Sequence, residues 1–319
     1  METAPAAPFL YTGALENHRG VLAALAARRE LLGNPPEVCA AVRDPWQVAS
    51  CLGRRGLRCP ELRRPGEEPR EGTWLVKPLR GAGGAGIAHL EGTQPPADTF
   101  LQEFIEGEPR SAVFAGDGQR AVLMGVSRQL VGLHRFGAAP FAYCGSIGPL
   151  AVPAEEAAAW RAMGNALAEH FGLRGLFGVD AIVAGGEVVC IEVNPRYTAS
   201  VEVHELALGA SAISWHVAAC RGELPAPPDA PPGHLVGKAY LFAKEEVRVP
   251  EGLPAAAAGV EGLLGLADLP WPGSAIARGA PVLTVLAGAD GEEACARLLG
   301  RVAGLLYRAL GCEDPASRD

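Results

Sequence analysis

Three oxygen-bearing side chains lie on a pair of predicted strands in the middle of the sequence. Asp180 is in the first strand, and Glu192 and Asn194 are in the second, within the stretch FGVDAIVAGGEVVCIEVNPRY at 177–197. Val, Ile and Phe alternate on either side of a Gly-Gly pair, which predicts two strands joined by a tight turn. Carboxylate and amide oxygens on such a hairpin suit a hard cation, Mg²⁺ above all, and Arg196 would extend donors toward an anion. An ordinary hairpin with a solvated polar face explains the same residues equally well.

The register of this hairpin decides whether its carboxylates meet. With a two-residue Gly-Gly turn, Asp180 falls opposite Ile191, and Glu192 points to the other face. With a loop one residue longer, Asp180 falls opposite Glu192, and Asn194 shares that face. A cation site therefore predicts an odd-length loop, or a bulge that restores the same parity.

A glycine-rich loop follows a short predicted strand about a hundred residues upstream. The stretch TWLVKPLRGAGGAGI at 73–87 contains Lys77 and four glycines. Backbone N–H groups of such a loop can approach phosphate closely, and the lysine adds a point charge. The spacing of Gly81, Gly83 and Gly86 formally fits G-x-G-x-x-G, but a strand-like, Pro-broken segment follows instead of a helix, which excludes a Rossmann fingerprint. A Walker A loop is excluded as well, since no G-K-[ST] closes the loop.

Three stretches of the sequence, in this order, resemble the ATP-grasp superfamily. They are VKPLRGAGGAGI, FLQEFIEGEPRSAVF and the hairpin GVDAIV…VVCIEVNPR, and the resemblance covers 43–222. The EVNPR form is similar to the carbamoyl-phosphate-synthetase and carboxylase-like branches. YTGALENH, Gly33-Asn34 and VRDP also resemble a narrower group, the ATP-grasp proteins associated with tetrahydromethanopterin- and methanofuran-linked one-carbon metabolism. The resemblance implies an α+β ATP-grasp fold, in which two α+β subdomains grip ATP.

The resemblance also implies a role for each motif residue. Lys77 would contact the ATP phosphates, and Arg196 would steady the phosphoryl or acyl-phosphate group as a second catalytic residue. Glu108 is the nearest candidate for gripping the ribose, although a solvated turn residue explains it equally well and Pro109 stands where the acid would align. The glycines that would cover the phosphates are Gly81, Gly83, Gly84 and Gly86. The hinge against adenine would be Gln102, Glu103, Phe104 and Ile105. The ligands of Mg²⁺, with Mn²⁺ as the alternative, would be Asp180, Glu192 and Asn194.

One position departs from the family pattern. Many ATP-grasp enzymes carry a second ATP-binding lysine directly after the aspartate of VRDP, where this chain has Asp44-Pro45. Arg43 is a candidate substitute, although arginine and lysine differ in geometry.

By resemblance, the expected activity is that of an ATP- and Mg²⁺-dependent ligase. A carboxylate would attack the γ-phosphate, and an amine or a thiol would then displace phosphate from the acyl phosphate. Small-molecule carboxylates and amines are the expected partners. Two alternatives stay open. The missing lysine and the short N-terminal region favour a nucleotide-binding protein without ligase turnover, and an ATP-dependent phosphotransferase would release a stable phosphorylated product.

Composition restricts the remaining classes. The chain has 319 residues, 49% of them hydrophobic and 20% charged, which predicts a folded core rather than disorder. A formal charge of −8 gives nucleic-acid binding no electrostatic support. The opening METAPAAPFL lacks the features of a signal peptide, and no apolar stretch has membrane-spanning length, so a cytoplasmic protein without a membrane partner is expected. The eight cysteines form no C-x-x-C pair, so reduced thiols are expected and zinc is not.

Three regions are expected along the chain. Residues 1–42 would be a truncated pre-ATP-grasp segment, because ATP-grasp proteins usually begin with a complete βαβ domain. Residues 43–224 would be the ATP-grasp domain, with a glycine-loop subdomain at about 63–105 and a metal-hairpin subdomain at about 106–224. Residues 225–319 would form a β-rich cap with a terminal helix, beginning at the proline-rich stretch PAPPDAPPG.

Periodicity predicts the main helices and strands. An amphipathic helix is expected at 14–32, and its uncovered apolar stripe would favour aggregation or a homodimer. Further helices are expected at 153–172, at 201–220 with a break at Gly209, and at 292–310. The other strands are expected at 100–105, 110–114, 120–126, 237–243 and 280–287.

Overall fold

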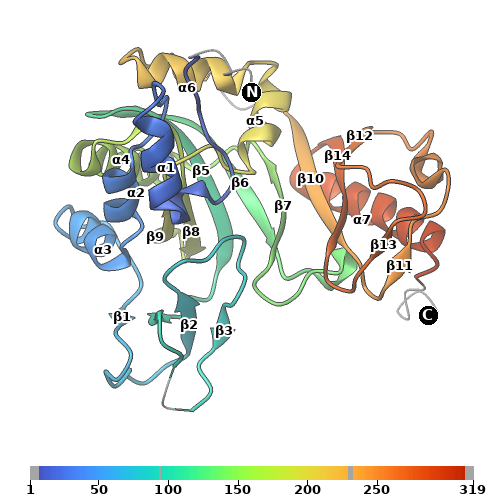
Figure 1. Cartoon of the computed structure of the whole chain (residues 1–319), viewed down its shortest axis with the longest axis horizontal. Helices are drawn as coiled ribbons and strands as arrows, with labels where there is room; N and C mark the ends of the chain where they lie inside the picture. Colours follow the sequence, from blue (N-terminus) through green and yellow to red (C-terminus); the bar gives the residue numbers. More distant parts are fainter. Residues whose placement is uncertain (1–6, 93–94, 229–232, 313–319) are drawn as a thin grey trace.

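The computed structural model describes residues 7–92, 95–228 and 233–312. Its largest sheet has eight strands: β5 Glu108–Asp117, β6 Ala121–Val131, β7 Tyr143–Gly148, β8 Arg174–Ala184, β9 Glu187–Asn194, β10 His234–Phe242, β12 Leu263–Ala267 and β14 Pro281–Asp290. They run in the order β12-β14-β10-β7-β6-β5-β8-β9 across the molecule (Figure 1). Every neighbouring pair is antiparallel.

Alternating side chains give the central strands two apolar faces. Phe114 of β5 packs on one face with α4 (Ala154–Phe171), whereas Val113 packs on the other face near α6 (Ala212–Cys220). Helix α4 ends at Gly172 in the left-handed conformation, with φ 71°. The helix predicted at 153–172 is therefore confirmed.

The C-terminal third of the chain extends the same sheet. Strand β10 pairs with β7 on one side and with β14 on the other. Helix α7 (Glu292–Ala309) covers β10 and β14 and buries the apolar stripe that predicted it. Helix α5 (Val201–Leu208) is separated from α6 at Gly209, as predicted. The proline-rich stretch at 225–233 thus lies between two parts of one sheet; its residues 229–232 lie outside the described residues.

A second, smaller sheet carries the glycine loop. Its strands are β1 Leu62–Arg63, β2 Trp74–Pro78, β3 Ala88–His89 and β4 Thr99–Glu103, in the order β1-β4-β2-β3. This sheet projects from the large one at the bottom of Figure 1. Leu75 pairs with Gln102, and Lys77 pairs with Phe100, so these four side chains share one face. The glycine loop connects β2 to β3.

In the N-terminal region the structure differs from the long helix that the sequence predicted. A single 3₁₀ turn at Leu15–Asn17 and α1 (Arg19–Ala26) replace the helix expected at 14–32. The chain leaves the helix early because residues near Leu31 form a parallel bridge with Phe9. Leu22 is fully buried, so the apolar stripe is covered in part.

Two short helices follow, α2 (Pro36–Val42) and α3 (Pro45–Gly53). Asp44 caps α3, since its Oδ1 accepts from Trp46 N at 3.0 Å and from Gln47 N at 3.2 Å. Within VRDP, the aspartate and proline are therefore a helix start. The remaining short elements are η2 His134–Phe136, β11 Val247–Arg248, η3 Leu253–Ala257 and β13 Ala275–Ile276. None of the described helices is long and apolar enough to cross a membrane.

Candidate active site

The β8–β9 hairpin brings two carboxylates together through a bulge. The turn occupies Gly185-Gly186, and the strands pair regularly as far as Ala181 opposite Cys190. The register then shifts by one residue, so that Asp180 pairs with Glu192. The predicted bulge that restores parity is confirmed, and both carboxylates lie on one face of the hairpin.

Asp180 is held by hydrogen bonds to each of its oxygens. Its Oδ1 accepts from Gln129 Nε2 of β6 at 2.9 Å, and its Oδ2 accepts from Asn194 Nδ2 at 3.0 Å. Burial, together with the negative charge of Glu192, raises the pKa of Asp180 to about 7. A cation between the two carboxylates would relieve this repulsion.

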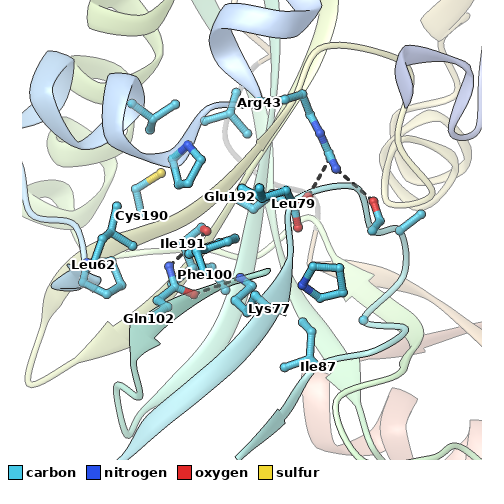
Figure 2. A pocket seen from close by; sticks show the side chains of 18 of the residues that line it. Arg43, Leu62, Lys77, Leu79, Ile87, Phe100, Gln102, Cys190, Ile191 and Glu192 are labelled. Carbon is cyan, nitrogen blue, oxygen red and sulfur yellow. Dashed lines mark hydrogen bonds and ion pairs between the residues drawn. The ribbon is translucent and has the colours of Figure 1, made fainter. Parts of the chain in front are cut away.

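Arg43 reaches across the site from the elbow between α2 and α3. Its Nη1 donates to Glu192 Oε1 at 2.7 Å, and its Nη2 donates to the carbonyl of Gly81 at 2.9 Å (Figure 2). The side chain is only 12% exposed. Arg43 therefore links three elements: the helix elbow, the glycine loop and the carboxylate hairpin.

Arg196 is oriented by the N-terminal segment. Its Nε donates to Glu16 Oε1 at 2.6 Å, and its Nη2 donates to Asn194 Oδ1 at 3.3 Å. The Glu16 side chain is fully buried, and its second oxygen, Oε2, has no hydrogen-bond partner among the described residues. The N-terminal segment thus supplies a buried anion that fixes the arginine at the end of the EVNPR motif.

A chain of hydrogen bonds crosses the cleft between the two sheets. Lys77 Nζ donates to Gln102 Oε1 at 2.9 Å, and Gln102 Nε2 donates to the carbonyl of Ile191, the bulged residue, at 3.4 Å (Figure 2). Burial lowers the pKa of Lys77, while the negative charges of Glu192 and Asp180 oppose this shift. We call this chain the partition.

The larger of two cavities lies on the hinge side of the partition, and we call it the hinge-side cavity. It encloses about 1170 Å³ of space, including its open mouth. Nearly all the predicted site residues line it: Lys77, Gly83, Gly84, Gln102, Glu103, Phe104, Ile105, Asp180, Glu192, Asn194 and Arg196. The apolar side chains of Leu75, Ile182 and Ile191 also face it.

The smaller cavity, which we call the helix-side cavity, lies against α2 and α3 and encloses about 720 Å³ (Figure 2). Val48, Leu62 and Phe100 give it apolar walls, and Arg43 lies at its polar end. Seven residues line both cavities: Lys77, Gly83, Gly84, Ile87, Gln102, Ile191 and Glu192. The partition therefore divides one cleft into two cavities.

The glycine loop is docked on the segment before β7. The Gly83 carbonyl accepts from Tyr143 N at 3.0 Å. Gly84 has φ 81°, and a Cβ there would lie 1.9 Å from the carbonyl oxygen of Phe141. Only glycine allows this approach. Of the four predicted glycines, Gly86 lines neither cavity.

Glu108 lies apart from the other predicted residues. Its carboxylate accepts from Arg110 Nη2 at 2.6 Å, and it does not line either cavity, whereas its neighbour Pro109 lines the hinge-side cavity. Arg110 is held in turn by Glu156 of α4 at 2.7 Å. The contacts of Glu108 are thus those of an ion pair at the surface.

The donor set between the carboxylates fits a hard divalent cation. Among the described residues, no group of three or more His, Cys, Asp and Glu side chains could hold a metal ion. A cation here would have two carboxylates, Asp180 and Glu192, with the Asn194 amide beside them, and it would take its remaining ligands from water or an anion. Mg²⁺ is commonly bound in this way, through one or two carboxylates and phosphate oxygens.

Three contacts of the site were not assigned from the sequence. Glu16 and Gln129 carry no motif signal, because their roles come from contacts with residues 180 and 51 positions away in the chain. Arg43 was considered as a lysine substitute, but its bridge between Gly81 and Glu192 could not be read from spacing.

A family model described as an ATP-grasp domain matches residues 42–200. No curated protein matches the sequence. Solved structures with a similar fold include N5-carboxyaminoimidazole ribonucleotide synthetase from Thermus thermophilus, at 19% identity and a TM-score of 0.68; the match covers 97% of this chain and 82% of that one.

Two further structures cover most of the chain. The biotin carboxylase domain of 2-oxoglutarate carboxylase from Hydrogenobacter thermophilus, in complex with MgADP, ADP and bicarbonate, is 14% identical with a TM-score of 0.67, over 91% of this chain and 72% of that one. L-amino acid ligase from Bacillus licheniformis is 14% identical with a TM-score of 0.69, over 89% and 75%. At these identities the likeness concerns the fold.

Proposed function

We propose that this chain, which has the α+β ATP-grasp fold and carries an ATP-grasp domain at residues 42–200, is an ATP- and Mg²⁺-dependent carboxylate–amine or carboxylate–thiol ligase. The observation that carries the proposal is the bulged register of the β8–β9 hairpin. It sets Asp180 beside Glu192 at the edge of a cavity that Lys77 and Arg196 also line. Two carboxylates and two cations around one cavity suit a metal-bound polyphosphate.

Each residue has a definite task in this proposal. Adenine would lie between Leu75 and Ile182, against the hinge at residues 102–105. Lys77 would neutralise phosphate oxygens, and backbone N–H groups of the glycine loop would cover them. Bound Mg²⁺ would supply charge neutralisation on the phosphates, held by Asp180 and Glu192 with Asn194 beside them.

The arginines would act on the reacting groups. Arg196, fixed by Glu16, would hold the attacking carboxylate or the acyl phosphate with its free N–H directions. Arg43 would turn from Glu192 to the phosphates when nucleotide enters, in place of the lysine that many relatives carry after the aspartate. Its pairing with a metal-ligand carboxylate is consistent with this, because Glu192 would exchange one cation for another.

Two finer assignments belong to the same proposal. The EVNPR motif favours the carboxylase-like branch, and the YTGALENH and VRDP stretches favour the narrower one-carbon group. A nucleotide-binding protein without turnover is the second candidate. Asp44-Pro45 favours it, because many relatives carry a second ATP-binding lysine where this chain has Pro45.

Hydroxylamine trapping distinguishes these functions. The full chain is incubated with ATP, Mg²⁺, hydroxylamine and pools of small carboxylic acids, and both ADP and hydroxamate are measured. A ligase should form ADP and hydroxamate in equal amounts with one pool, because hydroxylamine captures the acyl phosphate. ADP without hydroxamate in any pool would indicate a phosphotransferase. Nucleotide binding without ADP formation, across all pools, would identify a binding protein.

A further inference from the structure

Cys59 and Cys190 lie on segments that are far apart in the sequence but adjacent in space. Arg58 and Val189 form an isolated parallel bridge, and Cys190 N donates to the Arg58 carbonyl at 3.0 Å. The residues that follow a bridge in both strands are themselves neighbours, because adjacent strands run about 4.8 Å apart. The side chains of Arg58 and Glu187 lie on the opposite face, where Arg58 Nη1 pairs with Glu187 Oε2 at 2.6 Å. Cys59 and Cys190 therefore share the other face.

Cys59 and Cys190 both line the helix-side cavity. A strand separation of about 4.8 Å lies within the range of about 4.4–6.8 Å between Cα atoms that disulfides span. The neighbouring Cys190 thiol lowers the pKa of Cys59, and burial opposes this shift, whereas the pKa of Cys190 is raised. Cys59 is half-buried, whereas Cys190 is buried, so Cys59 is the more exposed residue of the pair. Figure 2 shows Cys190 among the side chains that line this cavity.

We propose that Cys59 and Cys190 are a redox-active pair, which a low-molecular-weight disulfide converts to an intramolecular disulfide. The Cys59 thiolate attacks one sulfur of the oxidant, forms a mixed disulfide and releases one small thiol. The Cys190 sulfur then attacks the Cys59 sulfur and releases the second small thiol. Two protein thiols are oxidised, one small disulfide is reduced, and the two protons pass to the released thiolates.

The disulfide would join two parts of the site. Cys59 precedes β1, the first strand of the glycine-loop sheet, and Cys190 stands two residues before Glu192 on β9. Oxidation would therefore tie the base of the glycine-loop sheet to the carboxylate hairpin. This inference does not depend on the proposed ligase activity, since it concerns thiols alone.

The test counts thiols after oxidation of the full chain. The protein is incubated with glutathione disulfide, and free thiols are then alkylated under denaturing conditions and counted by mass spectrometry. The count should fall from eight, the number of cysteines, by two, and a peptide linking Cys59 to Cys190 should appear. C190S should stop at a glutathione adduct on Cys59, and C59S should form neither product. C51S is the matched control, because Cys51 is buried in the same apolar core as Cys190, beside α4, and this variant should still form the link.

The proposal would be overturned by eight free thiols after oxidation, by a link between other cysteines, or by a glutathione adduct on Cys59 of the wild type without the link. If C190S proves unfolded by circular dichroism, the comparison of wild type, C59S and C51S still shows whether the disulfide requires Cys59. Retention of the same linked mass in C59S would exclude the pair.

Discussion

Lys77 is a charged residue that is almost completely buried. Its side chain is 8% exposed, burial lowers its pKa, and its ammonium donates to Gln102 Oε1 at 2.9 Å. A phosphate in the hinge-side cavity would provide this ammonium with an anionic partner, which the neutral amide cannot replace.

Lys77→Ala should therefore weaken ATP binding by about 10- to 100-fold, the range that corresponds to losing a charge-assisted hydrogen bond. Calorimetry with ATP and Mg²⁺ measures the effect, and circular dichroism checks the fold. Arg55→Ala is the control, because Arg55 pairs with Glu169 at the exposed surface. Equal ATP affinity in Lys77→Ala and wild type would exclude the role of Lys77 in phosphate binding.

In the proposed function Glu192 would have a different task from Lys77, since it would meet the metal rather than the nucleotide. Glu192→Gln keeps the size of the side chain and removes the charge that balances Arg43 and the cation. We expect ADP formation to fall about 100-fold or more, the scale of losing one electrostatic contact in the transition state. The affinity for ATP measured without Mg²⁺ should change less than about threefold. A variant that instead loses thermal stability, with its remaining folded fraction fully active, would contradict the assignment.

At the scale of elements, Arg43 is the contact that holds the glycine loop near the hairpin. Arg43→Gln keeps a donor but loses the ion pair with Glu192 and the reach to the Gly81 carbonyl. Amide hydrogen exchange at residues 81–86 should therefore become faster, and the KM for ATP should rise about tenfold. Arg58→Gln, which breaks only an exposed pair with Glu187, is the control. Unchanged exchange in the loop would show that Arg43 does not restrain it.

Helix α5 carries a buried histidine above β6. His204 is fully buried, neither of its ring nitrogens has a hydrogen-bond partner among the described residues, and burial lowers its pKa to about 4. An unfolded histidine titrates near 6.5. Between these two values the unfolded state binds a proton that the folded state does not. The free energy of unfolding should therefore decrease as the pH falls from 6.5 to 4, by up to about 3 kcal/mol from this residue.

His204→Leu should remove this part of the pH dependence. Urea unfolding at pH 7.5 and pH 5 measures it in the wild type and the variant. Burial also lowers the pKa of His216, so some pH dependence should remain. His170→Gln, at an exposed position of α4, is the control. The same loss of stability on acidification in both His204→Leu and wild type would contradict the expectation.

The sequence predicted those elements whose signals are local. Helices α4 and α7 were predicted from apolar periodicity. The need to place Asp180 beside Glu192 predicted either an odd-length loop or a bulge, and the structure has the bulge. The α+β ATP-grasp fold class is also confirmed. The predicted helix at 14–32 was wrong in length, because a bridge between Phe9 and Leu31 overrides local helix propensity. Glu16 was not predicted for the same reason. Its contact with Arg196 depends on tertiary structure, which local sequence patterns do not reveal.

At the scale of the whole molecule, one sheet joins the carboxylate hairpin to the C-terminal region. Strand β9 lies at one edge and β12 at the other, with β10 paired to β7 between them. The two halves should therefore unfold together. Leu299 of α7 is fully buried in the C-terminal core cluster and packs against the position where a Cβ on Gly237 would lie.

Leu299→Ala should lower the free energy of unfolding by about 2–5 kcal/mol. Trp160 of α4 packs with Phe114 and Met163 in the core cluster of the other half. Trp271 lies in the C-terminal region, so the measurement is made in a Trp271→Phe background, in which the buried Trp160 reports the distant half. Tryptophan fluorescence and far-ultraviolet circular dichroism should give the same shifted urea midpoint. Leu299→Ala with two separate transitions, only one of them shifted, would show that the C-terminal region unfolds independently.

For the design of inhibitors, the partition of Lys77, Gln102 and the Ile191 carbonyl sets a choice of scaffold. A compound confined to the hinge-side cavity would rely on backbone groups that nucleotide pockets commonly present. A compound that crosses the partition must replace hydrogen bonds of 2.9 and 3.4 Å, and in return it reaches the apolar walls formed by Val48 and Phe100. Side chains differ between proteins more readily than backbone groups do. Contacts in the hinge-side cavity would therefore provide most of a compound's affinity. Contacts with side chains of the helix-side cavity would provide its selectivity for this protein.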